Sequence, residues 1–259
     1  MNPVRPKKSL GQHFLTDQNI ARDIVAQLSD GLETVIEVGA GTGVLTQYMV
    51  NDLKDKFYVI EIDTESVEYL EQHFPMLGDH LIHDDFLRCD LSRFGQQNMA
   101  IIGNFPYNIS SQIFFHVLKH KDQVVEVVGM VQKEMAERMA AKEGSKTYGI
   151  LSVLLQAWYD IDYLFTVHEH VFSPPPKVKS AVIKMRRNAV TDLGCDEQLF
   201  TTIVKQAFNQ RRKTMRNSLR TLLSTDIIGD VVFDKRPEQL SVKEFIDLTN
   251  LIGSHRANP

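Results

Sequence analysis

The sequence predicts an α/β protein whose central sheet is largely parallel, followed by a small all-helical part. Short, almost continuously apolar segments alternate with amphipathic segments of helical period over the first two thirds of the chain. Strands of this kind are apolar throughout because helices cover both faces of a parallel sheet. The stretch 187–196 then loses all periodicity. We therefore place a domain boundary there, with a first domain at 1–187 and a helical domain at 188–259.

The elements of the first domain follow from the period of the apolar residues. Thr16 or Asp17 can cap a helix whose buried stripe runs from Ile20 to Leu28. Further helices are expected at 44–49, 65–73, 110–118 and 148–158. Strands are expected at 34–38, 57–60, 81–82, 100–103, 124–128, 163–168 and 180–185. In the second domain, apolar residues recur at helical spacing over 199–207, 215–222 and 244–252.

Composition is that of an ordinary globular protein. Of the 259 residues, 43% are hydrophobic and 24% are charged, and no apolar run is long enough to span a bilayer. The basic, polar start lacks the apolar core of a secretory signal. Cys89 and Cys195 lie far apart without CxxC spacing, which argues against a disulfide framework or a zinc site. We expect a cytoplasmic, monomeric protein without a metal or a membrane partner.

Positive charge is concentrated in one segment. Residues 176–220 contain 11 Lys/Arg and 3 acidic residues, a local net charge of +8, so the rest of the chain carries −12 of the total of −4. This asymmetry predicts a basic face on an acidic body and therefore an anionic partner such as nucleic acid. A solvated helix face is the alternative explanation of any one basic run.

A glycine-rich turn follows the first expected strand. Gly39, Gly41 and Gly43 have G-x-G-x-G spacing, whereas a dinucleotide fingerprint would place its third glycine at Val44. The sequence also lacks the GK[ST] ending of a phosphate-binding loop. Without the fingerprint of a dinucleotide site or of a phosphate-binding loop, the glycine turn indicates a ligand that has a ribose but no pyrophosphate.

Carboxylates follow the next strands at the same edge of the sheet, where ligands bind in parallel sheets. Glu61 is placed to accept both ribose hydroxyls, and Glu37 lies where a cationic ammonium or sulfonium could sit. Asp85 can accept from an adenine amino group while Phe86 packs on the ring. The set predicts S-adenosylmethionine as the cofactor. An NAD site and a purely structural glycine turn are the alternatives.

The segment Asn104-Phe105-Pro106-Tyr107 follows the fourth expected strand. An amide, a proline and two aromatic rings are unusual for a tight turn. They suit a flat heterocycle with an amino group, because the Asn104 side-chain oxygen and the Phe105 carbonyl can each accept one N–H. Tyr107 can stack on the ring. A loop whose rings merely pack is the alternative.

This arrangement predicts methyl transfer to an adenine amine. Two acceptors would direct the lone pair of the amine at the methyl group, so catalysis is mainly orientation and needs no strong base. Cytosine C5 methylation would need a cysteine where Phe105 stands. The base must be unpaired or flipped out to reach such a site. Phe172, held by Pro174, Pro175 and Pro176, is expected as a second stacking face opposite Tyr107, with a role in the core as the alternative.

From about residue 5 to residue 251 the chain resembles the bacterial small-subunit ribosomal RNA adenine dimethyltransferases. The matching segments are 11–15, 37–43, 61–63, 104–110, 172–181 and 209–217. The resemblance implies a seven-stranded, Rossmann-like class I methyltransferase fold. It also implies N6,N6-dimethylation of two adjacent adenosines in the 3′-terminal hairpin of 16S rRNA, with a role in small-subunit biogenesis. His13 and Phe105 depart from the Asn and Leu that are usual in this family.

The resemblance implies cofactor contacts at His13, Leu15, Gly39, Glu61, Asp85 and Asn104. The strand-end residues themselves add Glu37, Gly41, Gly43, Ile62 and Phe86 to the expected cofactor site. The target base is expected at Asn104, Phe105, Pro106, Tyr107 and Phe172. Contacts with rRNA phosphates, which position rather than specify, are expected at Lys7, Lys8, Lys177, Lys179, Arg211, Arg212, Lys213 and Arg216. The partner would be the small ribosomal subunit. A large-subunit methyltransferase of the antibiotic-resistance type and a ribosome-assembly factor with secondary methylation are the alternatives.

Overall fold

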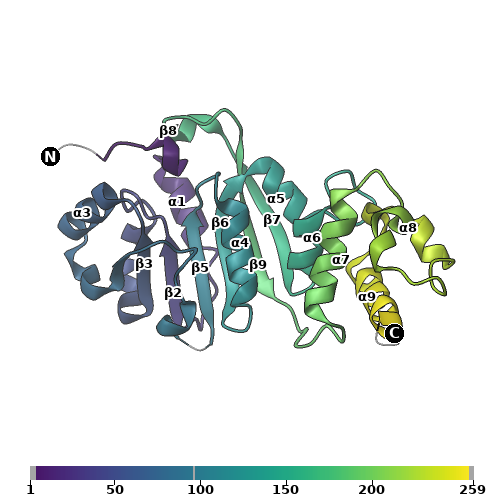
Figure 1. Ribbon diagram of the computed structural model, residues 1–259. Helices are drawn as coiled ribbons and strands as arrows, with labels where there is room; N and C mark the ends of the chain where they lie inside the picture. The colour runs from purple at the N-terminus through teal and green to yellow at the C-terminus, as the bar shows by residue number, and fades with distance from the viewer. Residues whose placement is uncertain (1–3, 96, 257–259) are drawn as a thin grey trace. The chain divides into compact units, whose positions relative to one another are not determined.

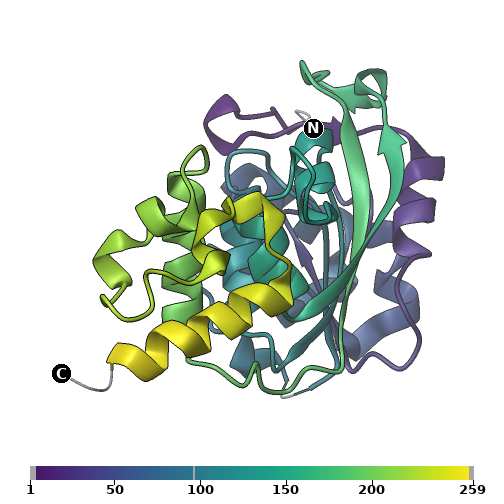
Figure 2. The same cartoon turned by 90° about the vertical axis from the view of Figure 1, so that its right-hand side faces the viewer.

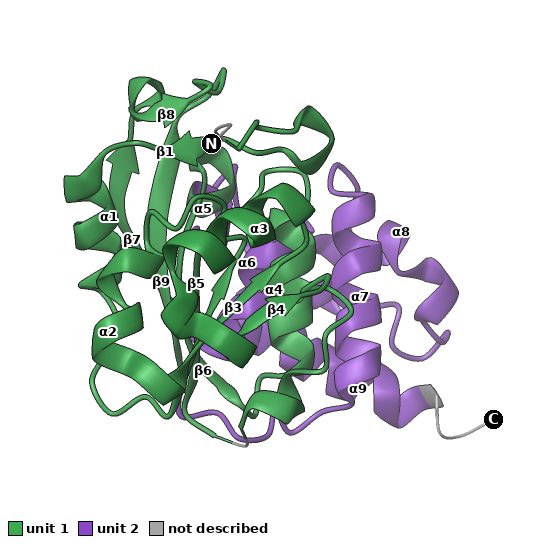
Figure 3. Cartoon of the chain, turned by 90° about the vertical axis from the view of Figure 1, so that its left-hand side faces the viewer, with its two compact units in different colours: residues 1–136, 161–187 green, residues 137–160, 188–259 purple. Residues whose placement is uncertain are grey.

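The computed structural model describes residues 4–95 and 97–256, whose helices and strands are labelled in Figure 1. They form two compact units, coloured in Figure 3. The first comprises Met1–Ala136 and Ile161–Arg187, and the second comprises Glu137–Asp160 and Asn188–Pro259. The chain therefore changes unit after residue 187, where periodicity is lost. Residues 137–160, which the sequence analysis placed in the first domain, pack with the helices of the second unit.

A seven-stranded sheet organises the first unit. Its strand order is β4-β3-β2-β5-β6-β9-β7. These strands are β2 (Thr34–Val38), β3 (Phe57–Glu61), β4 (Leu81–His83), β5 (Met99–Asn104), β6 (Val124–Gln132), β7 (Tyr159–Val167) and β9 (Ser180–Arg187). A separate antiparallel pair joins β1 (Phe14–Leu15) to β8 (Phe172–Ser173). The predicted strands are all present, and the α/β fold class is confirmed.

The pairing directions fix where the strand ends lie. Strand β2 pairs in parallel with β3 and β5, β3 with β4, and β5 with β6. The carboxyl ends of these strands therefore meet at one edge of the sheet. Strand β9 runs antiparallel to β6, with Lys184 opposite Val128. An antiparallel strand on an otherwise parallel sheet is common in large mixed sheets.

Helices cover both faces of this sheet. The helices of the first unit are α1 (Gln18–Val25), α2 (Val50–Leu53), α3 (Thr64–His73) and α4 (Ser110–Lys119), with α5 (Lys133–Met139) at the junction of the units. Figures 1 and 2 show α1 and α4 on opposite faces. Helix α1 begins at Asp17, whose side chain accepts hydrogen bonds from the backbone N–H groups of Asn19 and Ile20. Its Ile24 is buried against the core formed by β2, β3 and β5.

One predicted helix is wrong. The segment expected as a helix at 44–49 forms a turn and a short 3-10 helix, Thr46–Tyr48, before α2 begins at Val50. The left-handed backbone of Gly41 and Gly43 keeps the glycine turn itself out of a helical conformation, and the 3-10 helix begins only at Thr46.

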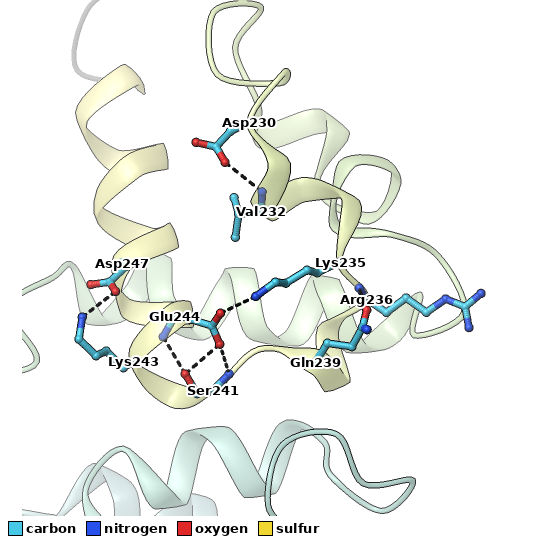
Figure 4. A network of polar contacts seen from close by, with 9 residues as sticks. All are labelled: Asp230, Val232, Lys235, Arg236, Gln239, Ser241, Lys243, Glu244 and Asp247. Carbon is cyan, nitrogen blue, oxygen red and sulfur yellow. Dashed lines mark hydrogen bonds and ion pairs between the residues drawn. The ribbon is translucent and has the colours of Figure 1, made fainter.

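The second unit is helical. It contains α6 (Ile150–Gln156), α7 (Glu197–Asn209), α8 (Met215–Ser218) and α9 (Val242–Arg256). The rings of Phe208 and Phe245 meet in its core at a centroid distance of 5.9 Å. Figure 4 shows the start of α9, where the backbone N–H of Ser241 donates to Glu244 over 2.8 Å and Lys235 pairs with the same carboxylate. Within the described ranges, no helix is both long and apolar enough to cross a bilayer.

Candidate active site

A cavity lies at the carboxyl ends of β2, β3 and β5 in the first unit. The strand ends form its floor, the loop after β4 forms one side, and the segment before β1 forms another. Its lining residues are Leu10–Phe14, Val38, Gly39, Gly41, Ile60–Ile62, Asp84–Leu87 and Asn104–Ile109. A smaller neighbouring cavity is lined by Leu15, Glu37 and residues of the glycine turn, and it shares Phe14, Gly39 and Asn104 with the first. Residues predicted from four separate strand ends thus converge.

The three glycines of the turn differ in whether they line a cavity or pack against a neighbouring ring. Gly39 and Gly41 have positive φ angles of 71° and 57° and line the main cavity. A Cβ at Gly41 would lie 2.7 Å from the ring of Phe14. Gly43 lines neither of the two cavities, and a Cβ there would lie 2.3 Å from the ring of Phe74. The structure therefore does not bring Gly43 to the predicted cofactor site.

Glu61 is held rigidly at the end of β3. Its two carboxylate oxygens accept the backbone N–H groups of Gly41 and Asp63, each over 2.9 Å. Burial raises the pKa of this carboxyl group, and the two backbone hydrogen bonds oppose the rise. Each oxygen keeps a lone pair for a further donor. The arrangement suits a pair of ribose hydroxyls.

Glu37 is the more deeply buried carboxyl group. It lies at the end of β2 and lines the smaller cavity, where Thr46 Oγ1 donates to it over 2.7 Å. Burial raises its pKa to about 8, and the nearby Glu61 adds to the rise. A cation placed in this cavity would favour the ionised form. Glu37 is therefore suited to an ammonium or sulfonium group.

Asp85 and Phe86 line the main cavity on the loop after β4. One Asp85 oxygen accepts the backbone N–H of Leu87 over 3.0 Å, and the second lies 3.6 Å from the exposed guanidinium of Arg88. The Phe86 ring is buried and meets His116 edge-on at 5.1 Å. A fixed carboxylate beside a fixed ring can hold an adenine by its amino group and its face.

Asn104 and Phe105 divide their roles between cavity and core. The Asn104 side-chain N–H group donates to the His13 carbonyl over 2.8 Å. Among the described residues, its Oδ1 has no partner, so it is available as an acceptor. The Phe105 ring is buried edge-on against Phe114. It fills the space beside Gly129, where a Cβ would lie 2.2 Å from the ring.

The predicted aromatic walls are only partly in place. Tyr107 lines the cavity, and its hydroxyl lies 2.5 Å from Ser180 Oγ. The His13 ring is 5.3 Å from the Tyr107 ring, and His13 Nδ1 is 2.8 Å from the Pro174 carbonyl. Phe172 is buried in the core at 4% exposure and does not line the cavity. The structure therefore favours the core role for Phe172, whose side chain belongs to the buried core of the first unit.

The basic residues expected on rRNA fall into two groups. Lys8, Lys177, Lys179, Arg212 and Lys213 are exposed. The other three are engaged within their own unit. In the first unit, the Lys7 ammonium pairs with Asp63 and, at 3.1 Å, with Glu65.

The two engaged arginines lie in the second unit. Arg211 donates to the Ser145 carbonyl over 3.2 Å and lies 3.8 Å from Glu238. Arg216 pairs with Asp234 at 2.6 Å and donates to the Ile228 carbonyl. Helix α8 begins only at Met215, so Arg212 precedes the helix that carries Arg216.

Some residues of the site were not predicted. Gln12 and Asn108 line the cavity, and Asn108 donates to the Ser9 carbonyl over 3.3 Å. Ser180 supplies the partner of the Tyr107 hydroxyl. The sequence offers a weak signal for Gln12, which lies between the predicted residues at 11 and 13. Ser180 lies in the matching segment 172–181, but its contact with Tyr107 follows only from the pairing of β9 with β6.

The sequence is similar to a known protein family and to individual proteins of known name. Residues 4–252 match the family described as ribosomal RNA adenine dimethylase. The chain is 57% identical to the ribosomal RNA small subunit methyltransferase A of Cytophaga hutchinsonii, over 98% of this chain and 99% of the relative. It is 58% identical to the protein of the same name from Bacteroides thetaiotaomicron, over 97% of this chain and 96% of the relative.

Solved structures share the fold at low sequence identity. A dimethyladenosine transferase from Plasmodium falciparum superposes with a TM-score of 0.78 at 22% identity, covering 93% of this chain and 98% of that one. The 23S rRNA methyltransferase ErmE superposes with a TM-score of 0.64 at 23% identity, covering 92% and 99%. At this level of sequence identity, the two superpositions show a shared fold.

Proposed function

Since the chain belongs to the ribosomal RNA adenine dimethylase family, we propose that it dimethylates N6 of two adjacent adenosines in the loop of the 3′-terminal hairpin of 16S rRNA. Its methyl donor is S-adenosylmethionine. The substrate is the small ribosomal subunit or a precursor of it in the cytoplasm, and methylation accompanies subunit biogenesis.

Asn104 is the observation that carries the proposal. Its Nδ2 is tied to the His13 carbonyl over 2.8 Å, which fixes the plane of the amide and leaves Oδ1 to accept a hydrogen bond. It stands in the wall of a cavity that also contains the Glu61 and Asp85 carboxylates. An adenine amine held there by Asn104 Oδ1 and the Phe105 carbonyl would have both N–H groups engaged.

The cavity fits the cofactor by the chemistry of its groups. Glu61 is oriented by two backbone hydrogen bonds for the ribose hydroxyls, and Asp85 with Phe86 would hold the adenine. Glu37 in the neighbouring cavity would compensate the positive charge of the amino-acid end. When bound, the cofactor supplies an electrophilic methyl group on a sulfonium.

The residues around the target base supply position rather than a proton acceptor. The buried Phe105 ring anchors the loop, and the backbone N–H of Phe105 donates to the Met130 carbonyl over 3.0 Å. The Pro106 carbonyl accepts from Ser110 Oγ over 2.7 Å, which fixes the start of α4. A rigid pair of acceptors lowers the barrier mainly by orientation. Tyr107 offers a ring on which a flipped-out adenine can stack.

Exposed basic residues are the proposed contacts with rRNA phosphates. In the first unit these are Lys8, Lys177 and Lys179. In the second unit they are Arg212 and Lys213. Phosphate contacts of this kind set the position of the RNA, and affinity then falls steeply with salt.

The proposal is tested by methyl transfer from labelled S-adenosylmethionine to small subunits that lack the modification. We expect label in dimethyladenosine near the 3′ end of 16S rRNA. The Asn104→Ala variant should lower the rate by about 100-fold or more, the typical loss for one fixed transition-state hydrogen-bond partner. Label in the large subunit, or none with either substrate, would refute the substrate assignment. A dead Asn104→Ala variant that still rescued subunit maturation would favour the assembly role.

A further inference from the structure

The segment from Lys7 to Leu15, which we call the N-terminal strap, forms one wall of the cavity. Its residues 10–14 line the cavity directly. Two asparagines at and after the end of β5 hold the strap. The Asn104 side chain donates to the His13 carbonyl, and the Asn108 side chain donates to the Ser9 carbonyl. At its far end the strap becomes β1, which pairs with β8.

Lys7 organises the near end of the strap. Its backbone N–H donates to Gln12 Oε1 over 2.8 Å, and its carbonyl accepts the backbone N–H of Leu10 over 3.1 Å. These bonds close a turn within the strap. The Lys7 side chain leaves that turn and pairs with Asp63 and Glu65 beyond the end of β3. Lys7 thus joins the strap to the floor of the cavity.

Asp63 carries this connection to the cofactor site. Its backbone N–H donates to Glu61 Oε1 over 2.9 Å, and its second carboxylate oxygen accepts from Ser66 Oγ over 2.9 Å. The other oxygen of Glu61 accepts the N–H of Gly41 over 2.9 Å. A continuous set of polar contacts therefore runs from the Lys7 ammonium to the carboxylate expected to bind ribose and on to the glycine turn.

The ion pair between Lys7 and Asp63 matters because the Asp63 carboxylate is buried. The Asp63 side chain is only 2% exposed, and an ionised carboxylate so placed needs a cation or several donors. Burial alone would raise the pKa of Asp63, but the hydrogen bonds from Lys7 and Ser66 outweigh it and lower the pKa. The Lys7 side chain is 35% exposed. Without Lys7, Asp63 would move toward water or protonate, and either change disturbs the turn that holds Glu61.

We propose that Lys7 is a positioning residue for the cofactor: it clamps the N-terminal strap to Asp63 and so fixes Glu61 and the near wall of the cavity. This differs from its predicted role on rRNA phosphates. The inference rests on the proposed function only in taking the cavity as the S-adenosylmethionine site. The strap held to Asp63 by Lys7 is the binding-competent arrangement, so a variant in which fewer molecules have this arrangement should show a proportionally higher apparent Kd.

The test measures binding of S-adenosylhomocysteine to the purified full chain by calorimetry, without RNA. Lys7→Met keeps the aliphatic stem and removes the charge, and we expect the Kd to rise about fivefold or more. Lys7→Arg restores the cation and should lie within about twofold of the wild type. Lys8→Met is the matched control, because Lys8 is exposed on the same strap and should leave the Kd unchanged.

Kinetics separates positioning from general damage. For Lys7→Met we expect a higher KM for S-adenosylmethionine, with kcat and the KM for the small subunit unchanged. A thermal unfolding midpoint near that of the wild type checks folding, and Lys7→Gln replaces Lys7→Met if it fails that check. An unchanged Kd in the Lys7 variants would overturn the inference while leaving the proposed function intact. Absence of binding by the wild type would overturn both.

Discussion

The cavity edge of the first unit and the basic segment 209–217 of the second unit both stood out in the sequence, but they differ in how far residue type determined their structure. At the cavity edge, Glu61, Asp85 and Asn104 converge as expected. In the basic segment, Arg212 is exposed whereas Arg211 and Arg216 bond to their own unit. Parallel pairing fixes where strand ends meet. A run of arginines does not determine which of them face solvent.

Within this comparison, the largest effect is expected from loosening the cavity edge at Gly129, which does not line the cavity itself. In Gly129→Ala, the new Cβ would lie 2.2 Å from the Phe105 ring, so the ring and its loop must shift. Because a misplacement of about 1 Å can cost about 100-fold in rate, kcat should fall by that order. Gly129 does not have a positive φ, so the loss comes from packing. Methyl transfer to small subunits measures it.

Gly229→Ala is the matched control, because no atom lies within 4 Å of its new Cβ and its φ is not positive. It should methylate at the wild-type rate. If Gly129→Ala kept full activity, the idea that the Phe105 anchor positions Asn104 would be wrong.

The same contrast shows what the sequence could and could not predict. Apolar runs predicted the strands of the sheet, most directly the almost fully buried β2, β3, β5, β6 and β9, because a strand buried on both faces must be apolar throughout. Strand order could not be predicted, so the contact of Ser180 with Tyr107 was missed. Phe172 was expected beside the base, but its side chain packs in the buried core of the first unit. Lys7 was assigned to rRNA as one of several basic residues, and its pairing with Asp63, 56 positions away in the chain, could not be predicted from the sequence.

One carboxyl group in each unit, Glu37 and Glu244, should make contributions to stability that change with pH in opposite directions. Burial raises the pKa of Glu37 to about 8, whereas the hydrogen bond from Lys235 lowers the pKa of Glu244 in the second unit. Glu37 therefore takes up a proton on folding, and its contribution to stability is present at low pH and lost as pH rises from about 4.5 to about 8. Glu244 contributes above its unfolded pKa, and this contribution is lost as pH falls.

Denaturant unfolding of the full chain across this range measures both effects. One proton changes the free energy of unfolding by at most about 1.4 kcal/mol per pH unit. Glu37→Gln should flatten the decline between pH 5 and 8. Part of the decline should remain, because burial also raises the pKa of Glu61. Glu244→Gln should change only the acid side. An identical pH profile for Glu37→Gln and the wild type would mean that Glu37 is ionised in the free protein.

The smallest expected effect is the difference in stability between variants of two arginines of the basic segment, Arg212 and Arg216. Arg216→Gln removes the pairing with Asp234 and the hydrogen bond to the Ile228 carbonyl, so it should cost about 1 kcal/mol of the free energy of unfolding. Arg212→Gln removes an exposed charge and should change stability by less than about 0.5 kcal/mol. Denaturant unfolding of the two variants measures the difference.

Binding to small subunits at several salt concentrations should reverse the order of the two variants. If Arg212 contacts a phosphate, Arg212→Gln lowers the slope of log affinity against log salt by about one. Arg216→Gln should leave the slope nearly unchanged, because its charge is already matched by Asp234. Equal slopes for Arg212→Gln and the wild type would reduce Arg212 to a solvated residue. A loss of slope in Arg216→Gln alone would mean that RNA displaces Asp234, so that intramolecular pairing does not mark an arginine as structural.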